Sequence, residues 1–295
     1  MPRSSAQGRF STGAYGVVGH DIVYSLSPYI FRTVFKALGW RADYAIFDIE
    51  KGELPSLLDA MRTAPIRGLN ITKPYKQTVI SHLDRLDDSA RVVGAVNTVV
   101  NVRGRLIGYN TDVEGVVAAL SRYGARLRGK DALILGAGGG ARAVAFALLK
   151  HFGVRGITIA ARRPVQARQL IHDVQDRMPP ARVASAAFRP VADFSEALAR
   201  ATLVVNATPI GSGTKKEERL LPKGVQFHSG AIAFDLVYRP RPTLFCRAAE
   251  DLGIRSIIDG WPMLIAQAEV AFRLWTGRGF PPNVRRQLLN TRQLP

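Results

Sequence analysis

The chain has 295 residues, of which 47% are hydrophobic and 22% are charged, so it is long enough for two domains that each bury a core. No apolar run approaches the ~18 residues of a membrane-spanning helix, and the single cysteine, Cys246, excludes a disulfide framework within the chain and fits a reducing compartment. Lys and Arg number 41 against 23 acidic residues, and the formal net charge of +18 indicates anionic partners without distinguishing nucleic acid, a membrane surface and small acidic ligands.

The N-terminal stretch MPRSSAQGRFST has neither the apolar core of a signal peptide nor the length of an amphipathic transit peptide, so we expect a disordered extension on a cytoplasmic protein. After it, strand-like and helix-like stretches alternate. The predicted strands cover 14–19, 43–49 and 67–72, and the predicted helices cover 27–39 and 53–63. Ser27 is predicted to cap the first helix and Pro28 to open it. This alternation indicates a mostly parallel sheet.

Two short strands and a helix are predicted between residues 94 and 124. An Arg-Gly pair within GAVNTVVNVRGRLIGYNTD predicts a turn between the two strands. In the helix that follows, over 111–124, Thr111 and Glu114 have the spacing of a capping box, and the apolar residues fall on one side. A strand, turn, helix and strand begin again at residue 131, so we expect this helix to be the hinge to a second domain.

The stretch DALILGAGGGA places Gly136, Gly138 and Ala141 at GxGxxA spacing between an apolar strand and a helix. The glycines permit a tight turn and a close backbone approach, and the helix N-terminus offers free N–H groups to a pyrophosphate. An ordinary strand-to-helix turn is the alternative. The complete order of strand, turn, helix and strand favours dinucleotide binding.

The end of the next strand indicates which dinucleotide binds. An NAD site is expected to carry an acidic residue about 20 residues after the first glycine, where its carboxylate holds the ribose 2′-OH. This sequence has Ala161, Arg162 and Arg163 there. Guanidinium groups suit a 2′-phosphate through charge-assisted hydrogen bonds. The sequence therefore predicts NADP as cofactor, unless the two arginines merely belong to a basic surface.

Nine short motifs follow one another along the chain. They are YSLSP (24–28), NITKPYK (70–76), GAVNT (94–98), NTD (110–112), GAGGGA (136–141), ARR (161–163), NATPIG (206–211), FDLVY (234–238) and DGWPMLIAQA (259–268). In these motifs and in their order, the chain resembles the shikimate dehydrogenase family, which includes quinate/shikimate dehydrogenases. The resemblance extends from Tyr15 to about Gly277.

That resemblance implies reversible hydride transfer between shikimate C3 and the nicotinamide of NADP, with 3-dehydroshikimate as the ketone, in aromatic amino acid biosynthesis through chorismate. The positions that match the family's catalytic pair are Lys76 and Asp112. The positions that match its substrate pocket are Ser25, Ser27, Asn70, Thr72, Asn97, Tyr238 and Gln267. The positions that match its cofactor side are Asp88, Gly136, Ala137, Gly138, Gly139, Gly140, Ala141, Arg162, Arg163, Asn206, Thr208, Leu236, Gly260 and Met263.

The proposed catalytic pair also has a chemical rationale. Reduction of a ketone requires a proton for the developing alkoxide, and a positioned side chain contributes ~10² to 10⁴ to the rate. Lys76 can donate that proton, and Asp112, at the start of a predicted helix, can hold the ammonium. The structural alternatives are a solvated lysine and a carboxylate stabilised by the helix dipole. The joint match of Lys76 and Asp112 to the family's catalytic pair favours the catalytic interpretation.

Two hydroxyls beside a helix N-terminus, those of Ser25 and Ser27, form a suitable cradle for the substrate carboxylate. Asn70, Thr72 and Lys76 would then face the ring hydroxyls and the reacting oxygen.

Gln267 lies among apolar residues on a predicted helix over 263–276. A buried amide without a partner costs ~1 to 3 kcal/mol, so we expect Gln267 to face a polar ligand; a hydrogen bond to backbone is the alternative. Two positions depart from the family pattern. Ala161 stands where an asparagine is usual, and Pro262 stands where a glycine is common.

These expectations combine into a two-domain α/β oxidoreductase without a metal. Residues 1–112 and 258–295 form a substrate-binding domain with a mostly parallel sheet, and residues 113–257 form an inserted Rossmann-type NADP-binding domain, with the active site in the cleft between them. We expect a monomer or homodimer, and Cys246 as a buried structural thiol. The rival functions are a quinate/shikimate dehydrogenase and a nucleic-acid binder, although scattered arginines without interleaved aromatics disfavour the latter.

Overall fold

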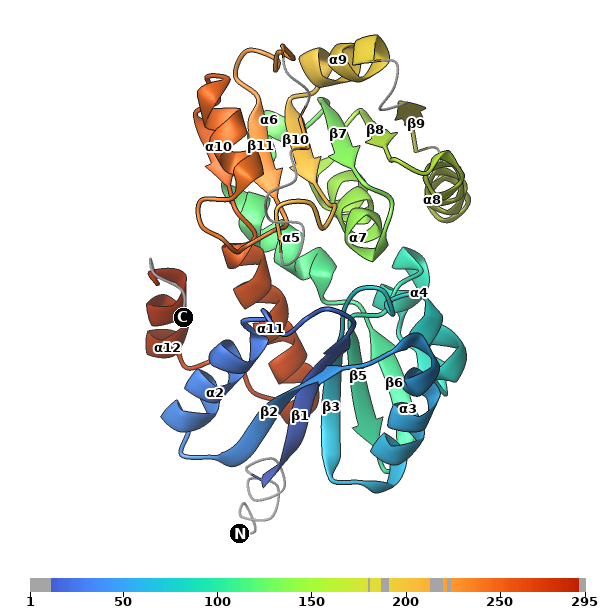
Figure 1. Cartoon of the computed structure of the whole chain (residues 1–295), viewed down its shortest axis with the longest axis vertical. Coiled ribbons are helices and arrows are strands. Elements are labelled where there is room, and N and C mark those ends of the chain that lie inside the picture. The colour runs from blue at the N-terminus through green and yellow to red at the C-terminus, as the bar shows by residue number, and fades with distance from the viewer. Residues whose placement is uncertain (1–11, 180, 187–190, 213–219, 222–223, 292–295) are drawn as a thin grey trace. The chain divides into compact units, whose positions relative to one another are not determined.

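The chain forms two compact units, which are drawn as ribbons in Figure 1. The structure, a computed structural model, describes residues 12–179, 181–186, 191–212, 220–221 and 224–291. The first unit is Met1–Thr111 with Leu264–Pro295, and the second is Asp112–Met263. Within the described ranges, no helix combines the length and the apolar character that crossing a bilayer requires.

The first unit is built on a sheet with strand order β2-β1-β3-β5-β6-β4. The strands are β1 (Thr12–Gly19), β2 (Arg41–Asp48), β3 (Ile66–Ile71), β4 (Arg85–Leu86), β5 (Thr98–Val102) and β6 (Arg105–Tyr109). The helices are α2 (Ser27–Ala37), α3 (Leu54–Thr63), α4 (Asp88–Val93), most of α11 (Trp261–Thr276) and α12 (Pro282–Leu289). β1 is parallel to β2 and β3, and β4 is parallel to β6, whereas β5 is antiparallel to both neighbours. The predicted mostly parallel sheet is confirmed.

Alternation along β3 determines what lies on each face of this sheet. Leu69 and Ile71 are buried in a core with residues of α3, and since successive side chains point to opposite faces, Gly68 and Asn70 point to the other face. There, Gly68 makes room for the indole of Trp275 from α11, because a Cβ at position 68 would overlap the ring. Asn70 therefore shares a face with the helix that carries Gln267.

The start of α2 differs from the sequence prediction. Ser27 is the first helical residue rather than the N-cap, and Leu26 occupies the cap position without a side-chain cap hydrogen bond. The Ser25 hydroxyl accepts a hydrogen bond from the Ser27 N–H at 3.3 Å. The prediction was wrong because residue type alone does not show how the preceding chain turns. Here the Ser25 N–H bonds the Ile22 carbonyl at 2.8 Å, and that turn brings the Ser25 hydroxyl to the helix end.

The predicted turn between β5 and β6 is confirmed. Arg103 and Gly104 form a two-residue connection with φ of 55° and 85°, and two-residue hairpins favour positive φ at both positions because that twist matches the strands. The glycine takes this conformation without the steric cost of a side chain.

The second unit is a doubly wound sheet in which every strand pair is parallel. Its strands are β7 (Asp131–Leu135), β8 (Gly156–Ala160), β9 (Val183–Ala186), β10 (Leu203–Asn206), β11 (Ile232–Asp235) and β12 (Ser256–Ile258). Its helices are α5 (Asp112–Leu120), α6 (Gly124–Leu127), α7 (Gly139–Ala147), α8 (Pro164–Arg177), α9 (Val191–Arg200) and α10 (Leu244–Asp251). The strand order β12-β11-β10-β7-β8-β9 is the Rossmann order, with its switch point between β7 and β10.

Two details of the second unit bear on the sequence predictions. The helix predicted over 111–124 is α5, which ends at Leu120 and is followed by a 3₁₀ turn and the short α6. Cys246, on α10, is 5% exposed, and burial raises the pKa of its thiol to about 12. The predicted burial of Cys246 is confirmed.

Candidate active site

A cluster of buried amides and hydroxyls lies in the first unit, at the end of β3 and the start of β5. The Asn70 side-chain oxygen accepts a hydrogen bond from the Tyr44 hydroxyl at 2.6 Å, and its nitrogen donates to the Thr98 hydroxyl at 3.1 Å. Asn70 is 6% exposed and Thr98 is fully buried. The amide plane of Asn70 is therefore fixed by neighbours from two other strands.

Asn97 links this cluster to the end of β6 and to α11. Its side-chain oxygen accepts from the Thr111 N–H at 2.7 Å, and its nitrogen donates to the Thr111 hydroxyl at 2.9 Å and to the Gln267 side-chain oxygen at 3.4 Å. The Gln267 nitrogen donates to the Leu264 carbonyl at 2.8 Å. The backbone bond considered as the alternative for Gln267 is thus present, and the opposite end of the same amide belongs to the polar cluster.

The NITKPYK loop runs beside this cluster. The Thr72 N–H bonds the Val18 carbonyl at 2.9 Å, and the Lys76 carbonyl accepts from the Val96 N–H at 2.7 Å. The buried Tyr75 ring anchors the loop between them, and its hydroxyl donates to the Ile49 carbonyl at 2.7 Å. Lys76 therefore leaves the loop next to the segment that carries Asn97, and its side chain is half-buried.

The two lysines of this loop have different surroundings. The Lys73 ammonium lies 5.3 Å from the centre of the Tyr24 ring, a cation–π distance. Lys73 is thereby directed to the YSLSP segment.

Asp112, the predicted partner of Lys76, is 5% exposed and is the first residue of α5. Its pairing with Lys76 stays a prediction. Asp88, predicted on the cofactor side, begins α4 as an exposed side chain paired with Arg91.

In the second unit, the glycine turn lies at the switch point of the sheet. Gly136 follows β7 with φ of 109°, a conformation that side chains rarely adopt. A Cβ on Gly136 would lie 3.0 Å from the Ala207 carbonyl oxygen, which follows β10. Gly138 is the N-cap of α7, and a Cβ there would meet nothing within 4 Å. The turn therefore packs closely on one side and leaves space in front of the helix N-terminus on the other.

The arginine pair follows β8 after one intervening residue, Ala161. Arg162 and Arg163 are exposed, whereas Ala161 is 9% exposed. Arg163 is the N-cap residue of α8, with Pro164 in the first turn. Both guanidinium groups thus stand at a carboxyl end of the sheet, the edge at which dinucleotide sites are found. The helix dipole of α8 adds positive potential for an anion.

The segments after β10 and β11 carry the remaining predicted positions. Asn206 is fully buried, and its side-chain oxygen accepts from the Thr208 N–H at 3.0 Å and the Thr208 hydroxyl at 2.7 Å. Leu236 and Tyr238 are half-buried. Gly260 donates its N–H to the Val237 carbonyl at 3.0 Å, and Met263 is 7% exposed.

Some residues of these networks were missed by the sequence analysis. Thr98 and Thr111 stand inside the GAVNT and NTD motifs, so the motifs themselves were a signal for them. Tyr44 lies in none of the motifs, and only the pairing of β1 with β2 and β3 brings it to Asn70. Asp235, within FDLVY, is fully buried and bonds Asn206 at 2.8 Å.

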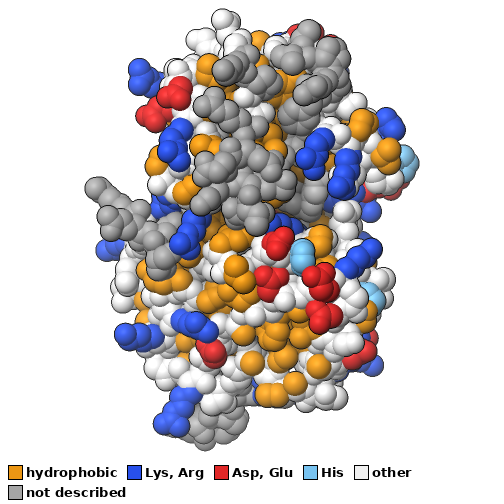
Figure 2. All heavy atoms as spheres, viewed as in Figure 1, with side chains coloured by type: hydrophobic (Ala, Val, Ile, Leu, Met, Phe, Trp, Pro, Cys, Tyr) orange, Lys and Arg blue, Asp and Glu red, His pale blue; other side chains and the backbone are white. Residues whose placement is uncertain are grey.

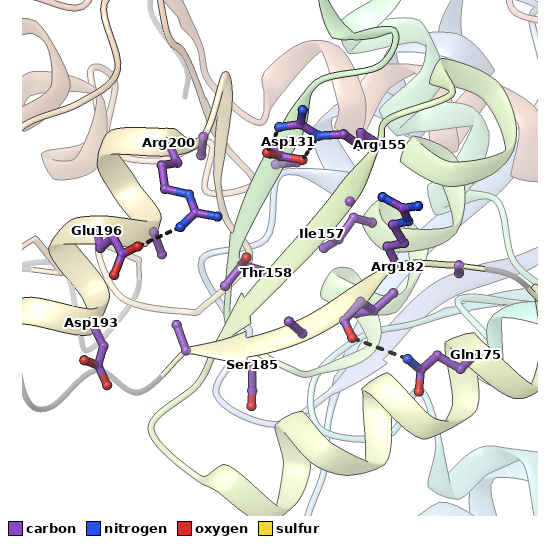
Figure 3. A pocket seen from close by; sticks show the side chains of 18 residues that line it. Asp131, Arg155, Ile157, Thr158, Gln175, Arg182, Ser185, Asp193, Glu196 and Arg200 are labelled. Atoms are coloured by element: carbon purple, nitrogen blue, oxygen red, sulfur yellow. Dashed lines mark hydrogen bonds and ion pairs between the residues drawn. The ribbon is translucent and has the colours of Figure 1, made fainter.

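A hollow of about 940 Å³ opens elsewhere in the second unit and is seen from close by in Figure 3. It is lined by the first residues of β7, β8 and β9 and by α9, at the strand ends opposite to the glycine turn. Four of its charged side chains form ion pairs within the hollow, Asp131 with Arg155 and Glu196 with Arg200 at 2.6 Å (Figure 3). We therefore do not place the site there. Among the described residues, no group of three or more His, Cys, Asp and Glu could hold a metal ion.

Comparison with known proteins identifies the family. The family model for the shikimate dehydrogenase substrate binding domain matches residues 17–99. A curated shikimate dehydrogenase (NADP(+)) from Moorella thermoacetica is 40% identical over 287 residues, which cover 96% of this chain and 94% of the relative.

Two solved structures are similar over nearly the whole chain. Shikimate 5-dehydrogenase from Thermus thermophilus in complex with NADP(H) and shikimate is 37% identical, with a TM-score of 0.79 over 94% of this chain and 98% of that one. Quinate dehydrogenase from Corynebacterium glutamicum in complex with NAD is 31% identical, with a TM-score of 0.81 over 95% and 99%. The resemblance found in the motifs is confirmed, and the chain belongs to the shikimate dehydrogenase family.

Proposed function

We propose that this chain is an NADP-dependent shikimate dehydrogenase, which reversibly reduces 3-dehydroshikimate to shikimate in the biosynthesis of aromatic amino acids through chorismate. The observation that carries the proposal is a combination within one chain of this family. A lysine, Lys76, is anchored beside a cluster of fixed amides, and the Rossmann unit has two exposed arginines after β8.

In this proposal Lys76 donates the proton to the developing alkoxide, and Asp112 holds its ammonium in place. The substrate is bound through its carboxylate by the hydroxyls of Ser25 and Ser27. Its ring hydroxyls are bound by the remaining pocket residues, Asn70, Thr72, Asn97, Tyr238 and Gln267. Hydrogen bonds hold the amides of Asn70, Asn97 and Gln267 in fixed planes, and such preorganisation lowers the entropy cost of orienting a small polyol.

The second unit fits a dinucleotide that carries a 2′-phosphate. The open space at Gly138, before the N-terminus of α7, suits the pyrophosphate. The exposed guanidinium groups of Arg162 and Arg163 suit the 2′-phosphate, and they stand where an NAD site is expected to carry a carboxylate. The other residues proposed to line the cofactor are Asp88, Gly136, Ala137, Gly139, Gly140, Ala141, Asn206, Thr208, Leu236, Gly260 and Met263. When bound, NADP supplies or accepts the hydride.

The Lys76→Ala variant tests the proposed proton donor, with Lys73→Ala as a matched control in the same loop. We expect Lys76→Ala to lower kcat with shikimate and NADP by about 10² to 10⁴. The Kd for NADP should stay within about 2-fold of wild type, because Lys76 is not among the residues proposed to line the cofactor. Lys73→Ala should keep wild-type turnover, since that ammonium faces Tyr24. Turnover near the wild-type value in Lys76→Ala would remove Lys76 from this role.

A second candidate function is quinate dehydrogenation, which the similarity to the Corynebacterium glutamicum enzyme favours. Quinate and shikimate are both cyclic hydroxy acids, so the same cradle suits either. The ratio of kcat/KM for shikimate to that for quinate, measured with NADP, separates the two. A ratio above one supports the shikimate enzyme, and a ratio below one assigns the chain to quinate.

We further propose that the chain acts in the cytoplasm as a monomer or homodimer and that nucleic acid is not its partner. The charge distribution supports the last point: on the face seen in Figure 2, Lys and Arg side chains are spread out rather than gathered in a stripe. A gel-shift titration against salt tests it. Tight, steeply salt-dependent binding without dehydrogenase activity would overturn this assignment.

A further inference from the structure

A buried carboxyl group links the ends of two neighbouring strands, β10 and β11. Asp235 is the last residue of β11 and is fully buried. Its Oδ1 accepts hydrogen bonds from the Asn206 Nδ2 at 2.8 Å and from the Val237 N–H at 2.9 Å. Its Oδ2 accepts from the Thr243 hydroxyl at 2.5 Å. Asp235 is not among the residues proposed to touch substrate or cofactor.

The first branch of this network holds the backbone conformation of the loop that follows β10. Asn206 donates to Asp235 and, at 3.2 Å, to the Ile210 carbonyl, while its oxygen accepts both the N–H and the hydroxyl of Thr208. The Thr208 hydroxyl in turn accepts from the Ile210 N–H at 3.2 Å. The loop over 206–210 is thus wound around one amide group, whose plane Asp235 fixes. This loop contacts Gly136 of the glycine turn through Ala207.

The second branch holds the backbone conformation of the segment that follows β11. The bond from the Val237 N–H to Asp235 closes a turn that sets the direction of Leu236. Leu236 lies against the glycine helix, since a Cβ on Gly140 would be 3.1 Å from its Cδ2. It also lies against Gly260, where a Cβ would overlap the Leu236 carbonyl. Thr243, the N-cap of α10, closes the network from the opposite side.

We propose that Asp235 is a positioning residue for the cofactor: through Asn206 and Val237, it holds the two segments that flank the glycine turn in the conformation that NADP binds. The proposal rests on the function proposed above. Without the carboxylate, the Asn206 amide and the Val237 N–H lose their shared acceptor. The backbone bond from the Leu236 N–H to the Asn206 carbonyl, at 2.9 Å, still joins the two segments, but the side-chain bonds that fix their conformation are lost. The binding-competent conformation is then populated only in part, and the apparent Kd rises by the inverse of that fraction.

Direct NADP binding to purified variants, without substrate, tests this inference. We expect Asp235→Ala to raise the Kd for NADP about 10-fold or more, in keeping with the loss of shared hydrogen bonds. Asp235→Asn keeps an oxygen acceptor for Asn206 and Val237, so its Kd should stay within about 3-fold of wild type. Phe194→Leu, in the buried core of the same unit, serves as a destabilising control that does not touch the network.

A merely structural role leads to a different expectation: Asp235→Ala and Phe194→Leu would both lower the unfolding temperature and leave the Kd unchanged in the folded protein. That result would overturn the proposal. If Asp235→Ala does not fold, Asp235→Ser carries the same expectation, because its short hydroxyl cannot serve both branches. Wild-type protein that fails to bind NADP would refute the proposed function, whereas tight binding by both wild type and Asp235→Ala would refute only the positioning role.

Discussion

In the proposed function, the choice of NADP over NAD depends on two side chains that can be removed one at a time. Arg162 and Arg163 are both exposed, so the bonds proposed between them and a 2′-phosphate would form in water-accessible surroundings. Hydrogen bonds to charged groups contribute about 1.5–3 kcal/mol, whereas exposed ion pairs contribute about 0.2–1 kcal/mol. We therefore expect each arginine to contribute about 1–2 kcal/mol, so that each single alanine variant raises the Kd for NADP about 5- to 30-fold.

The double variant should lose about 30-fold or more, and the Kd for NAD should change by less than about 2-fold in all three variants, since NAD has no 2′-phosphate. Arg168→Ala, at an exposed position farther along α8, is the matched control and removes the same formal charge. Titration of each variant with both cofactors is the assay. An equal loss of affinity for NADP and NAD, or a loss in Arg168→Ala as large as in the pair, would show that the arginines act through general charge rather than through the phosphate.

Three further predictions concern stability and reactivity. Gly68→Ala should lower the free energy of unfolding by about 1–3 kcal/mol, because its Cβ would overlap the buried Trp275 ring, whereas Gly52→Ala, with open space, should not; equal urea midpoints would contradict this. Burial raises the pKa of Asp235 to about 7 from 3.8. Between these pH values the folded state keeps a carboxyl proton that the unfolded state releases, so the stability that this proton contributes falls as pH rises from about 4 to 7. The unfolding free energy of wild type relative to Asp235→Asn should therefore drop by an amount on the order of 4 kcal/mol over that range, and parallel pH curves would refute it. Cys246, with a pKa of about 12 and 5% exposure, should react with a thiol reagent only on unfolding, and rapid labelling of native protein would be inconsistent with the structure.

Local patterns were sufficient to predict much of the fold. Apolar periodicity and turn residues predicted the alternation of strands and helices, the Arg103-Gly104 hairpin and the glycine turn before α7, because each depends on a few neighbouring residues. The predicted N-cap of α2 was wrong because the position of the cap depends on the path of the chain before the helix. The Ser25 hydroxyl accepts a hydrogen bond from the Ser27 N–H, and Ser27 is itself the first helical residue.

The candidate site was predictable where a motif contains its residues and unpredictable where strands from distant segments meet. Asn97 and Thr111 are both within motifs, yet their mutual bonds depend on the pairing of β5 with β6. Asp235 bonds Asn206, 29 positions away, only because β10 and β11 are neighbours in register. Pairing of this kind depends on tertiary structure, and no spacing rule within the sequence encodes it.

The proposed activity can be measured as the initial rate at which purified wild-type protein reduces NADP on addition of shikimate. We expect reduction of the nicotinamide at a rate that saturates with both substrates, and a higher kcat/KM with NADP than with NAD. No reduction of NADP by shikimate, in protein shown to be folded and to bind NADP, would contradict the assignment of this chain as an NADP-dependent shikimate dehydrogenase.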